Sequence, residues 1–146
     1  MAIRRLRSSL KRDEGLRASR VLIGKSRLVY VLIADKRLKY KDGKSRIAYI
    51  GTTKKGMSRI AQSIAARAED ILSLRGVYSF HARIITCGRR QNVKTWHKLE
   101  RALLLAFKER YGEVPRCNSH GKRMKITDEF RYFRRTGIFN LIDELT

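Results

Sequence analysis

The chain has 146 residues, a length that suits one domain with a core of its own. Lysine and arginine number 35 against 13 aspartate and glutamate residues, a formal net charge of +22, while 42% of the residues are hydrophobic. This composition excludes a disordered chain and favours a folded domain that binds a polyanion, most simply a nucleic acid, with an acidic membrane as the weaker alternative. The sequence lacks a membrane-spanning apolar run and a signal peptide, so we expect a cytoplasmic protein with no membrane partner.

The N-terminal segment is strongly basic. Ile3, Leu6 and Leu10 recur at helical spacing among arginines and lysines, which predicts a basic helix or arm over residues 1–22. Two roles are open for this arm: contact with nucleic-acid phosphates, or cover for one edge of the domain. We expect the remainder to be a core at 23–120 and a helical extension at 121–146 that packs on it, all within a single domain.

A hairpin is predicted next. Residues 28–34 form a short run rich in β-branched side chains and apolar on both faces, which is typical of a central strand. Residues 46–50 form a second strand, and the polar stretch between them contains Asp42-Gly43, which favours a long basic loop. We expect the cations of this hairpin to bind nucleic acid; they are Lys36, Arg37, Lys39, Lys41, Lys44 and Arg46.

Apolar periodicity divides the rest of the chain into helices and one strand. Residues 59–72 carry an apolar stripe directly after Ser58, which predicts a helix capped by that serine. Alternation across 77–86 predicts a third strand. Two further helical stretches are expected, at 95–110 and from Thr127 to Leu145 with a break at Gly137. The mixed order of strands and helices indicates an α+β fold.

Two familiar ligand-binding motifs are weak in this chain. The segment 51–58 lies between a strand and a helix, where a phosphate-binding P-loop would sit, but Met57 stands where that motif needs its lysine. A zinc site would use the close pair Cys117 and His120, yet no second close pair accompanies it. Neither motif predicts a function.

A dispersed set of residues carries a stronger signal. Tyr30 lies in the first strand, Tyr49-Ile50-Gly51 ends the second, and Arg59 opens a helix ten residues after Tyr49. Glu100 lies on the next long helix, and Asn118 follows Pro115. In this order and on these elements, the residues from 28 to 118 resemble the GIY-YIG nuclease family.

The resemblance implies a small three-stranded antiparallel sheet flanked by helices, and a metal-dependent endonuclease that hydrolyses phosphodiester bonds of DNA, most simply double-stranded. It implies that Glu100 holds one Mg²⁺ (or Mn²⁺), and that Arg59 contacts the phosphate to be cut. Tyr30 and Tyr49 would orient or deprotonate the attacking water, and Asn118 would hold the site together. Gly51 would let the backbone turn tightly beside the site. Lys54 and Lys55, next to the site, would add contacts to nucleic acid.

Several alternatives stay open at this point. The first tripeptide, Leu28-Val29-Tyr30, lacks the family's glycine, and Ser63 stands where relatives often carry histidine or tyrosine, so the proton acceptor is not assigned. Tyr30 could instead be a packing residue of the core. A non-catalytic RNA-binding protein of ribosomal type would also account for the size and charge, as would a nuclease fold that only binds. The oligomeric state is open, and a dimer is one possibility.

Overall fold

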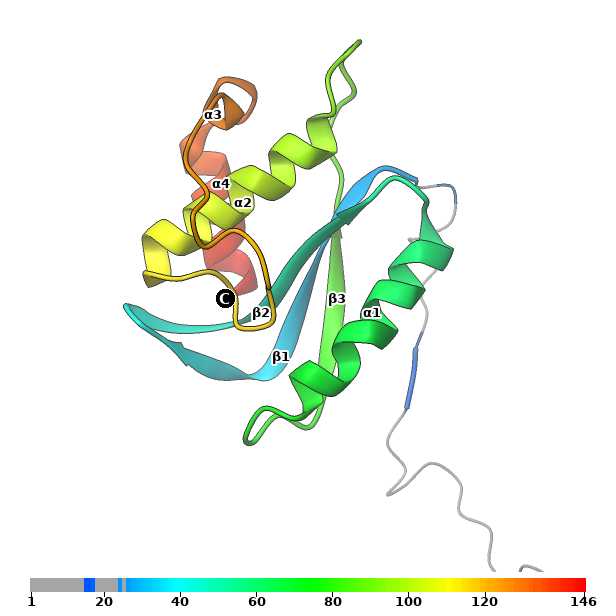
Figure 1. The fold of residues 1–146 in the computed structure, drawn as a ribbon, viewed down its shortest axis with the longest axis vertical. Helices are drawn as coiled ribbons and strands as arrows, with labels where there is room; N and C mark the ends of the chain where they lie inside the picture. The colour runs from blue at the N-terminus through cyan, green and yellow to red at the C-terminus, as the bar shows by residue number, and fades with distance from the viewer. Residues whose placement is uncertain (1–14, 18–23, 25) are drawn as a thin grey trace, which may run out of the picture.

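The computed structural model describes residues 15–17, 24 and 26–146, so most of the predicted arm at 1–22 lies outside the described residues. The described chain contains one sheet and four helices in the order predicted from the sequence (Figure 1). The elements are β1 (Leu28–Tyr40), β2 (Gly43–Thr53), α1 (Met57–Leu72), β3 (Phe80–Ile85), α2 (Thr95–Tyr111), α3 (Glu129–Tyr132) and α4 (Arg135–Leu145).

The sheet has three antiparallel strands in the order β2-β1-β3, so the most apolar strand lies at its centre. Tyr30 of β1 pairs with Gly51 of β2 on one side and with Ile84 of β3 on the other. This arrangement confirms the expected α+β fold with a small antiparallel sheet flanked by helices. No helix within the described residues is both long and apolar enough to cross a lipid bilayer.

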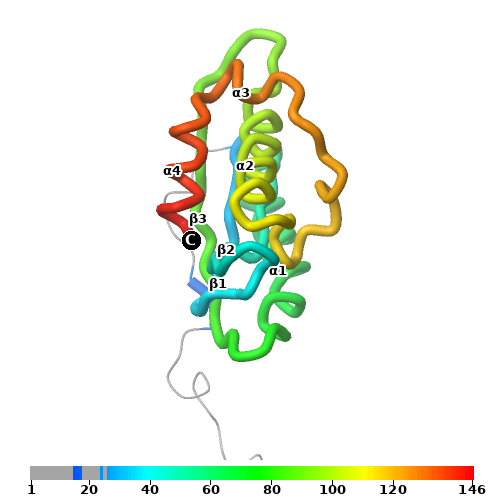
Figure 2. Tube along the Cα trace, turned by 90° about the vertical axis from the view of Figure 1, so that its left-hand side faces the viewer, coloured from blue at the N-terminus to red at the C-terminus, as the bar shows by residue number. Residues whose placement is uncertain are grey.

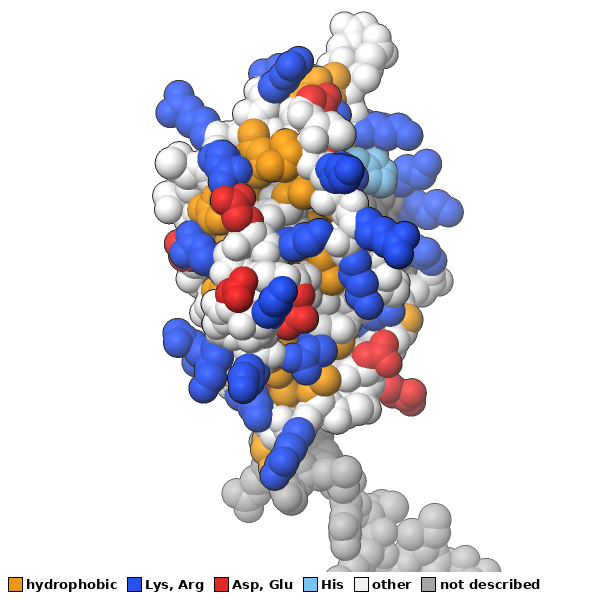
Figure 3. Space-filling model, turned by 60° about the vertical axis from the view of Figure 1, so that its left-hand side comes forward, with side chains coloured by type: hydrophobic (Ala, Val, Ile, Leu, Met, Phe, Trp, Pro, Cys, Tyr) orange, Lys and Arg blue, Asp and Glu red, His pale blue; other side chains and the backbone are white. Residues whose placement is uncertain are grey.

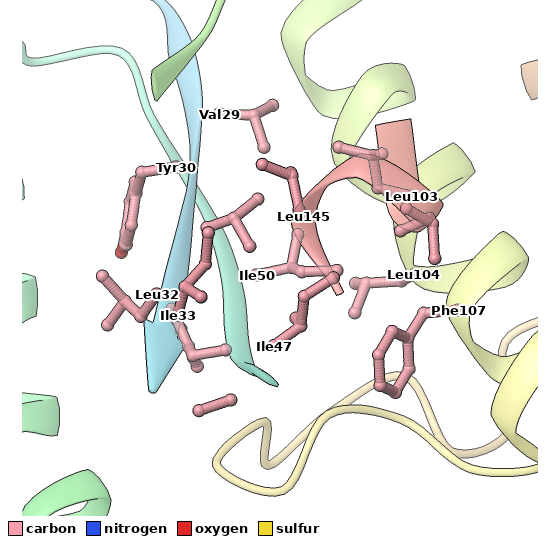
Figure 4. Close-up of a cluster of buried hydrophobic side chains, with 14 of the residues drawn as sticks. Val29, Tyr30, Leu32, Ile33, Ile47, Ile50, Leu103, Leu104, Phe107 and Leu145 are labelled. Carbon is pink, nitrogen blue, oxygen red and sulfur yellow. The ribbon is translucent and has the colours of Figure 1, made fainter. Parts of the chain in front are cut away.

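Helices cover both faces of the sheet, and this sandwich encloses the core. Figures 1 and 2 show α2 and α4 side by side against one face, with α1 against the other. Successive side chains of β1 point to opposite faces, so Tyr30 and Leu32 lie on the α1 side, away from Leu104 and Phe107 of α2 (Figure 4). The face toward α1 therefore carries a buried tyrosine where the other face carries aliphatic and phenylalanine side chains.

The predicted long basic loop is wrong, because both strands continue through it and meet at a tight turn over Lys41 and Asp42. Leu38 and Tyr40 alternate with the cations of this stretch and are buried. The Tyr40 hydroxyl donates to the Ile47 carbonyl at 2.6 Å, which ties the two strands together. Two buried side chains at strand spacing thus extend the hairpin despite its charge.

Three predicted element boundaries also shift. Helix α1 begins at Met57 behind Gly56, whose φ is 74°, and no side chain of the described residues caps it, so the expected Ser58 cap is wrong. Strand β3 begins at Phe80 because the Tyr78 N–H donates to the Asp35 carboxylate instead of joining the sheet. The C-terminal helix breaks at 133–134, and Gly137 lies inside α4.

A buried carboxylate fixes α3 against α2. Glu129 is fully buried and accepts from the Arg101 guanidinium at 2.6 Å and from the Thr127 N–H at 2.8 Å. Burial alone would raise the pKa of Glu129, but the guanidinium and the Thr127 hydrogen bonds outweigh it and hold that pKa at about 2. The C-terminal extension is therefore anchored by an ion pair as well as by the apolar side of α4.

Candidate active site

Two tyrosines from neighbouring strands meet over a glycine. The rings of Tyr30 and Tyr49 lie 5.9 Å apart, centre to centre. A Cβ atom at Gly51 would stand 2.6 Å from the ring and hydroxyl of Tyr30 and 2.6 Å from the ring of Tyr49. Position 51 therefore needs glycine because both rings occupy the space that any larger side chain would take, not because the backbone turns sharply there.

Tyr30 is the more buried of the two tyrosines, with 1% of its surface exposed. Burial raises the pKa of Tyr30 to about 12; a hydrogen bond from Ser63 opposes this rise, while Tyr49 and Glu100 add to it. Ser63 lies on α1, one turn after Arg59, so the helix brings a hydroxyl to the buried phenol. Tyr30 is thus held as a neutral phenol in contact with polar partners.

Tyr49 sits closer to the surface and to positive charge. The guanidinium of Arg67, on α1, lies over the Tyr49 ring at 4.9 Å from its centre. Cations in this position are attracted to the electron-rich face of the ring. Tyr49 therefore lies between the buried Tyr30 and the basic outer surface of α1.

Glu100 of α2 supplies a buried carboxylate whose charge reaches Tyr30. Its side chain is only 13% exposed, and the nearest ion-pair partner is His120, with Nε2 3.9 Å from a carboxylate oxygen. Burial raises the pKa of Glu100 to about 7, with only partial opposition from Arg101. Unlike Glu129, this carboxylate lacks a close guanidinium partner among the described residues.

Asn118 fixes the backbone of β2 next to the glycine. Its amide oxygen accepts from the Ile50 N–H at 3.0 Å, and its amide nitrogen donates to the Ile50 carbonyl at 2.9 Å. Both bonds are buried, and the neighbouring Cys117 N–H donates to the Ala48 carbonyl. The loop after α2 therefore pairs with β2 as a further strand would, which holds Tyr49 and Gly51 in place.

The structure does not bring every predicted residue into contact with this cluster. Arg59 is exposed in the first turn of α1, where its guanidinium donates to Gln62 at 3.4 Å. Within residues 26–146, no hydrogen bond or ion pair joins Arg59 to the tyrosines or to Glu100. Lys54 and Lys55 are exposed between β2 and α1, and the other predicted nucleic-acid contacts lie farther along the hairpin.

No match to this chain was found among models of known protein families, curated proteins or solved structures. Its function therefore has to be inferred from the side chains of the cluster, which we name the tyrosine–glutamate site: Tyr30, Tyr49, Gly51, Ser63, Glu100 and Asn118.

The donor set of this site fits one hard cation held by a single carboxylate. Among the described residues, no group of three histidine, cysteine or acidic side chains could hold a metal ion. Mg²⁺ does not need such a group, because it keeps several waters and is commonly bound through one or two carboxylates. Glu100 is a buried carboxylate whose charge reaches the Tyr30 phenol. A single carboxylate oxygen donor suits Mg²⁺, whereas a zinc site would need further histidine or cysteine ligands.

Two neighbours of the site were not predicted from the sequence. Arg67 lies two turns after Arg59 on α1, and helical spacing could have indicated it as a second cation on that helix. His120 was considered only as a zinc partner of Cys117, whereas the structure places it beside Glu100. This contact depends on the fold of the loop after α2, which the sequence pattern does not specify.

Proposed function

We propose that this protein is a metal-dependent endonuclease that hydrolyses phosphodiester bonds of double-stranded DNA. The observation that carries the proposal is a buried carboxylate, Glu100, whose charge reaches Tyr30, one of two tyrosines that meet over Gly51. Ionising a carboxyl group whose pKa is raised by burial costs stability, and such groups cluster at functional sites. A buried carboxylate with a structural role is paired with a cation, as Glu129 is with Arg101, whereas Glu100 has only His120 at 3.9 Å among the described residues.

The roles of the residues follow from their positions. Glu100 would hold Mg²⁺ or Mn²⁺, which when bound supplies charge to neutralise the phosphate and to activate water. Tyr30, held by Ser63, and Tyr49, facing Arg67, would position the attacking water and the phosphate. Asn118 acts through the backbone of β2 and is a positioning residue.

The tyrosine hydroxyls are expected to differ in their importance. With a pKa of about 12, Tyr30 is ionised in only about one molecule in ten thousand at pH 8, which makes it a poor proton acceptor. We therefore expect Tyr49→Phe to lower the single-turnover rate more than tenfold and Tyr30→Phe to lower it less than tenfold. Rates measured at saturating protein would show this order, and the reverse order would assign the proton transfer to Tyr30.

Arg59 is expected to act once DNA is bound, since its exposed guanidinium stands at the start of α1. Arg59→Lys keeps the charge but loses the planar fork that binds two phosphate oxygens. Turnover should fall more than tenfold, a barrier increase above about 1.4 kcal/mol. The same change at exposed Arg131 of α3 is the control. Equal turnover in both variants would leave Arg59 as a general contributor to surface charge.

Conversion of supercoiled plasmid to the nicked form, with Mg²⁺ and with a chelator, tests the function itself. We expect nicking that requires the metal. A protein that binds RNA and DNA tightly but nicks neither in Mg²⁺ or Mn²⁺ would instead support a non-catalytic binding protein of ribosomal type.

A further inference from the structure

A basic pocket lies near the turn of the long hairpin, away from the tyrosine–glutamate site along β1 and β2. It has a volume of about 340 Å³ and opens to solvent. Six of its lining residues are cations contributed by the two strands, the segment after α1 and the loop after α2: Lys36, Arg37, Lys39, Lys44, Arg75 and Arg116. We name these six residues and the space between them the hairpin pocket. Arg75 and Arg116 were not among the predicted contacts, because only the fold brings them to the hairpin.

One of these cations, Arg116, is held in place by the fold, and a second lies against a glycine. The Arg116 guanidinium donates to the Lys39 carbonyl and lies over the Tyr40 ring at 5.4 Å from its centre. Its backbone N–H also donates to the Tyr40 hydroxyl at 3.0 Å. Lys36 lies across Gly76, where an added Cβ would stand 2.7 Å from the ammonium nitrogen. The pocket is therefore partly organised before any ligand arrives.

Among the described residues, the cations of the hairpin pocket lack carboxylate partners. Within residues 26–146, none of its six cations forms an ion pair with a carboxylate. Of the residues that line the pocket, only Leu38 and Leu74 are uncharged. Figure 3 shows one face of the molecule with lysine and arginine side chains spread over most of it and fewer acidic side chains among them. Such a surface fits a ligand with several phosphates.

The spacing between the pocket and the tyrosine–glutamate site suits a nucleic-acid backbone. Tyr30 pairs with Gly51, and Lys39 pairs with Lys44, so the two sites are separated by the length of β2 from Gly51 to Lys44. This length is roughly 23 Å at about 3.3 Å per residue. It corresponds to about seven base pairs of duplex DNA at about 3.4 Å each.

We propose that the hairpin pocket binds backbone phosphates of duplex DNA about seven base pairs from the bond positioned at the tyrosine–glutamate site. This inference rests on the proposed function because it takes DNA as the ligand. It concerns the binding of DNA and not its cleavage. It adds a defined second contact, so a duplex must extend past the site of cleavage to bind fully.

Salt dependence of DNA binding separates this pocket from the general positive charge. The test variant is Lys39→Gln with Arg75→Gln, two exposed side chains, and the matched control is Arg131→Gln with Arg134→Gln near α3. Binding of a 24-base-pair duplex is measured by fluorescence anisotropy across a range of salt concentrations. Two lost phosphate contacts should flatten the plot of log affinity against log salt by about 1.8. The control should change the slope by less than half as much.

Duplex length gives a second readout. The native protein should lose at least tenfold in affinity as the duplex is shortened from 16 to 6 base pairs, and the pocket variant should lose clearly less. Equal slopes in the two variants, or equal length dependence in the native and pocket-variant proteins, would overturn the proposal. A pocket variant that loses binding to vesicles of anionic lipid or to inorganic phosphate, with unchanged DNA binding, would also overturn it.

Both measurements are independent of cleavage. If DNA binding depends on the pocket but the protein never nicks plasmid, the hairpin pocket stands as a DNA-binding site and the proposed nuclease activity is refuted. If the protein nicks plasmid with metal but the pocket variant binds DNA as the native protein does, the nuclease activity stands and the pocket proposal is refuted.

Discussion

Replacing Glu100 by glutamine is expected to lower DNA cleavage at least 100-fold, a barrier increase of about 2.7 kcal/mol, while DNA binding stays within about threefold of the native protein. The amide keeps the shape of the side chain but removes the negative charge that would hold the metal. Single-turnover cleavage of plasmid in Mg²⁺, together with anisotropy measurements of binding, checks both parts of the expectation.

The same substitution should make the protein more stable at high pH. The pKa of Glu100 is about 7 in the folded chain and about 4.5 when unfolded, so the folded state binds this proton more tightly. The cost of ionising the buried carboxyl is absent below about pH 4.5, grows as the pH rises, and is complete above about pH 7. Without metal, Glu100→Gln should therefore gain about 2–3 kcal/mol at pH 8.5 and little at pH 4.5.

Two other glutamates near the far end of α2 serve as controls for Glu100. Glu109 pairs with Arg135 at the surface, and Glu113 accepts from the Lys41 N–H at 2.9 Å. Glutamine at either position should leave the cleavage rate within about twofold of that of the native protein, because neither carboxylate is near Tyr30 or Tyr49. Full cleavage by Glu100→Gln, or an equal loss in the Glu109→Gln control, would remove Glu100 from the reaction.

Gly51→Ala is the second change with a large expected effect. The new Cβ would stand 2.6 Å from both tyrosine rings, closer than packed atoms approach, so the rings or the strand must move. Overpacking of this kind typically costs about 1–3 kcal/mol of stability. Because the displaced rings belong to the proposed site, the single-turnover rate should fall more than tenfold as well. Denaturant unfolding and plasmid cleavage measure the two effects.

Gly88→Ala is the matched control, since a Cβ at Gly88 would meet no atom within 4 Å in the described chain and its φ is not positive. This variant should differ from the native protein by less than about 0.5 kcal/mol and should cleave normally. If Gly51→Ala were as stable and active as Gly88→Ala, the contact of Tyr30 and Tyr49 over Gly51 would have no part in the site.

The sequence pattern predicted the elements of the core better than their ends. Alternation and helical spacing report which side chains are buried, and the longest buried runs lie in β1, from Leu28 to Ala34, and in α2, from Ala102 to Phe107. The hairpin was misjudged because its cations outnumber Leu38 and Tyr40, although burial of these two residues determines the structure. Ser58 was misjudged because helix α1 is fixed by packing of Ile60 and Ile71, without a side-chain cap.

The candidate site was predictable only as a set of residues in order. Motif spacing indicated Tyr30, Tyr49, Gly51, Glu100 and Asn118, and the structure places them on adjoining elements. Spacing could not reveal that Glu100 is buried, that Arg67 covers Tyr49, or that Arg75 and Arg116 close a pocket on the hairpin. These features depend on contacts between segments distant in sequence, for which a single sequence carries no periodic signal.

Titration of the Glu100 side-chain carboxyl by carbon-13 NMR, with and without Mg²⁺, tests most directly whether this carboxylate is kept buried for a metal. Glu100→Gln identifies the resonance. We predict a pKa of about 7 without metal, since burial disfavours the charge, and a lower value with millimolar Mg²⁺, because the cation favours the ionised form. A pKa near 4.5 that does not respond to Mg²⁺ would contradict the account.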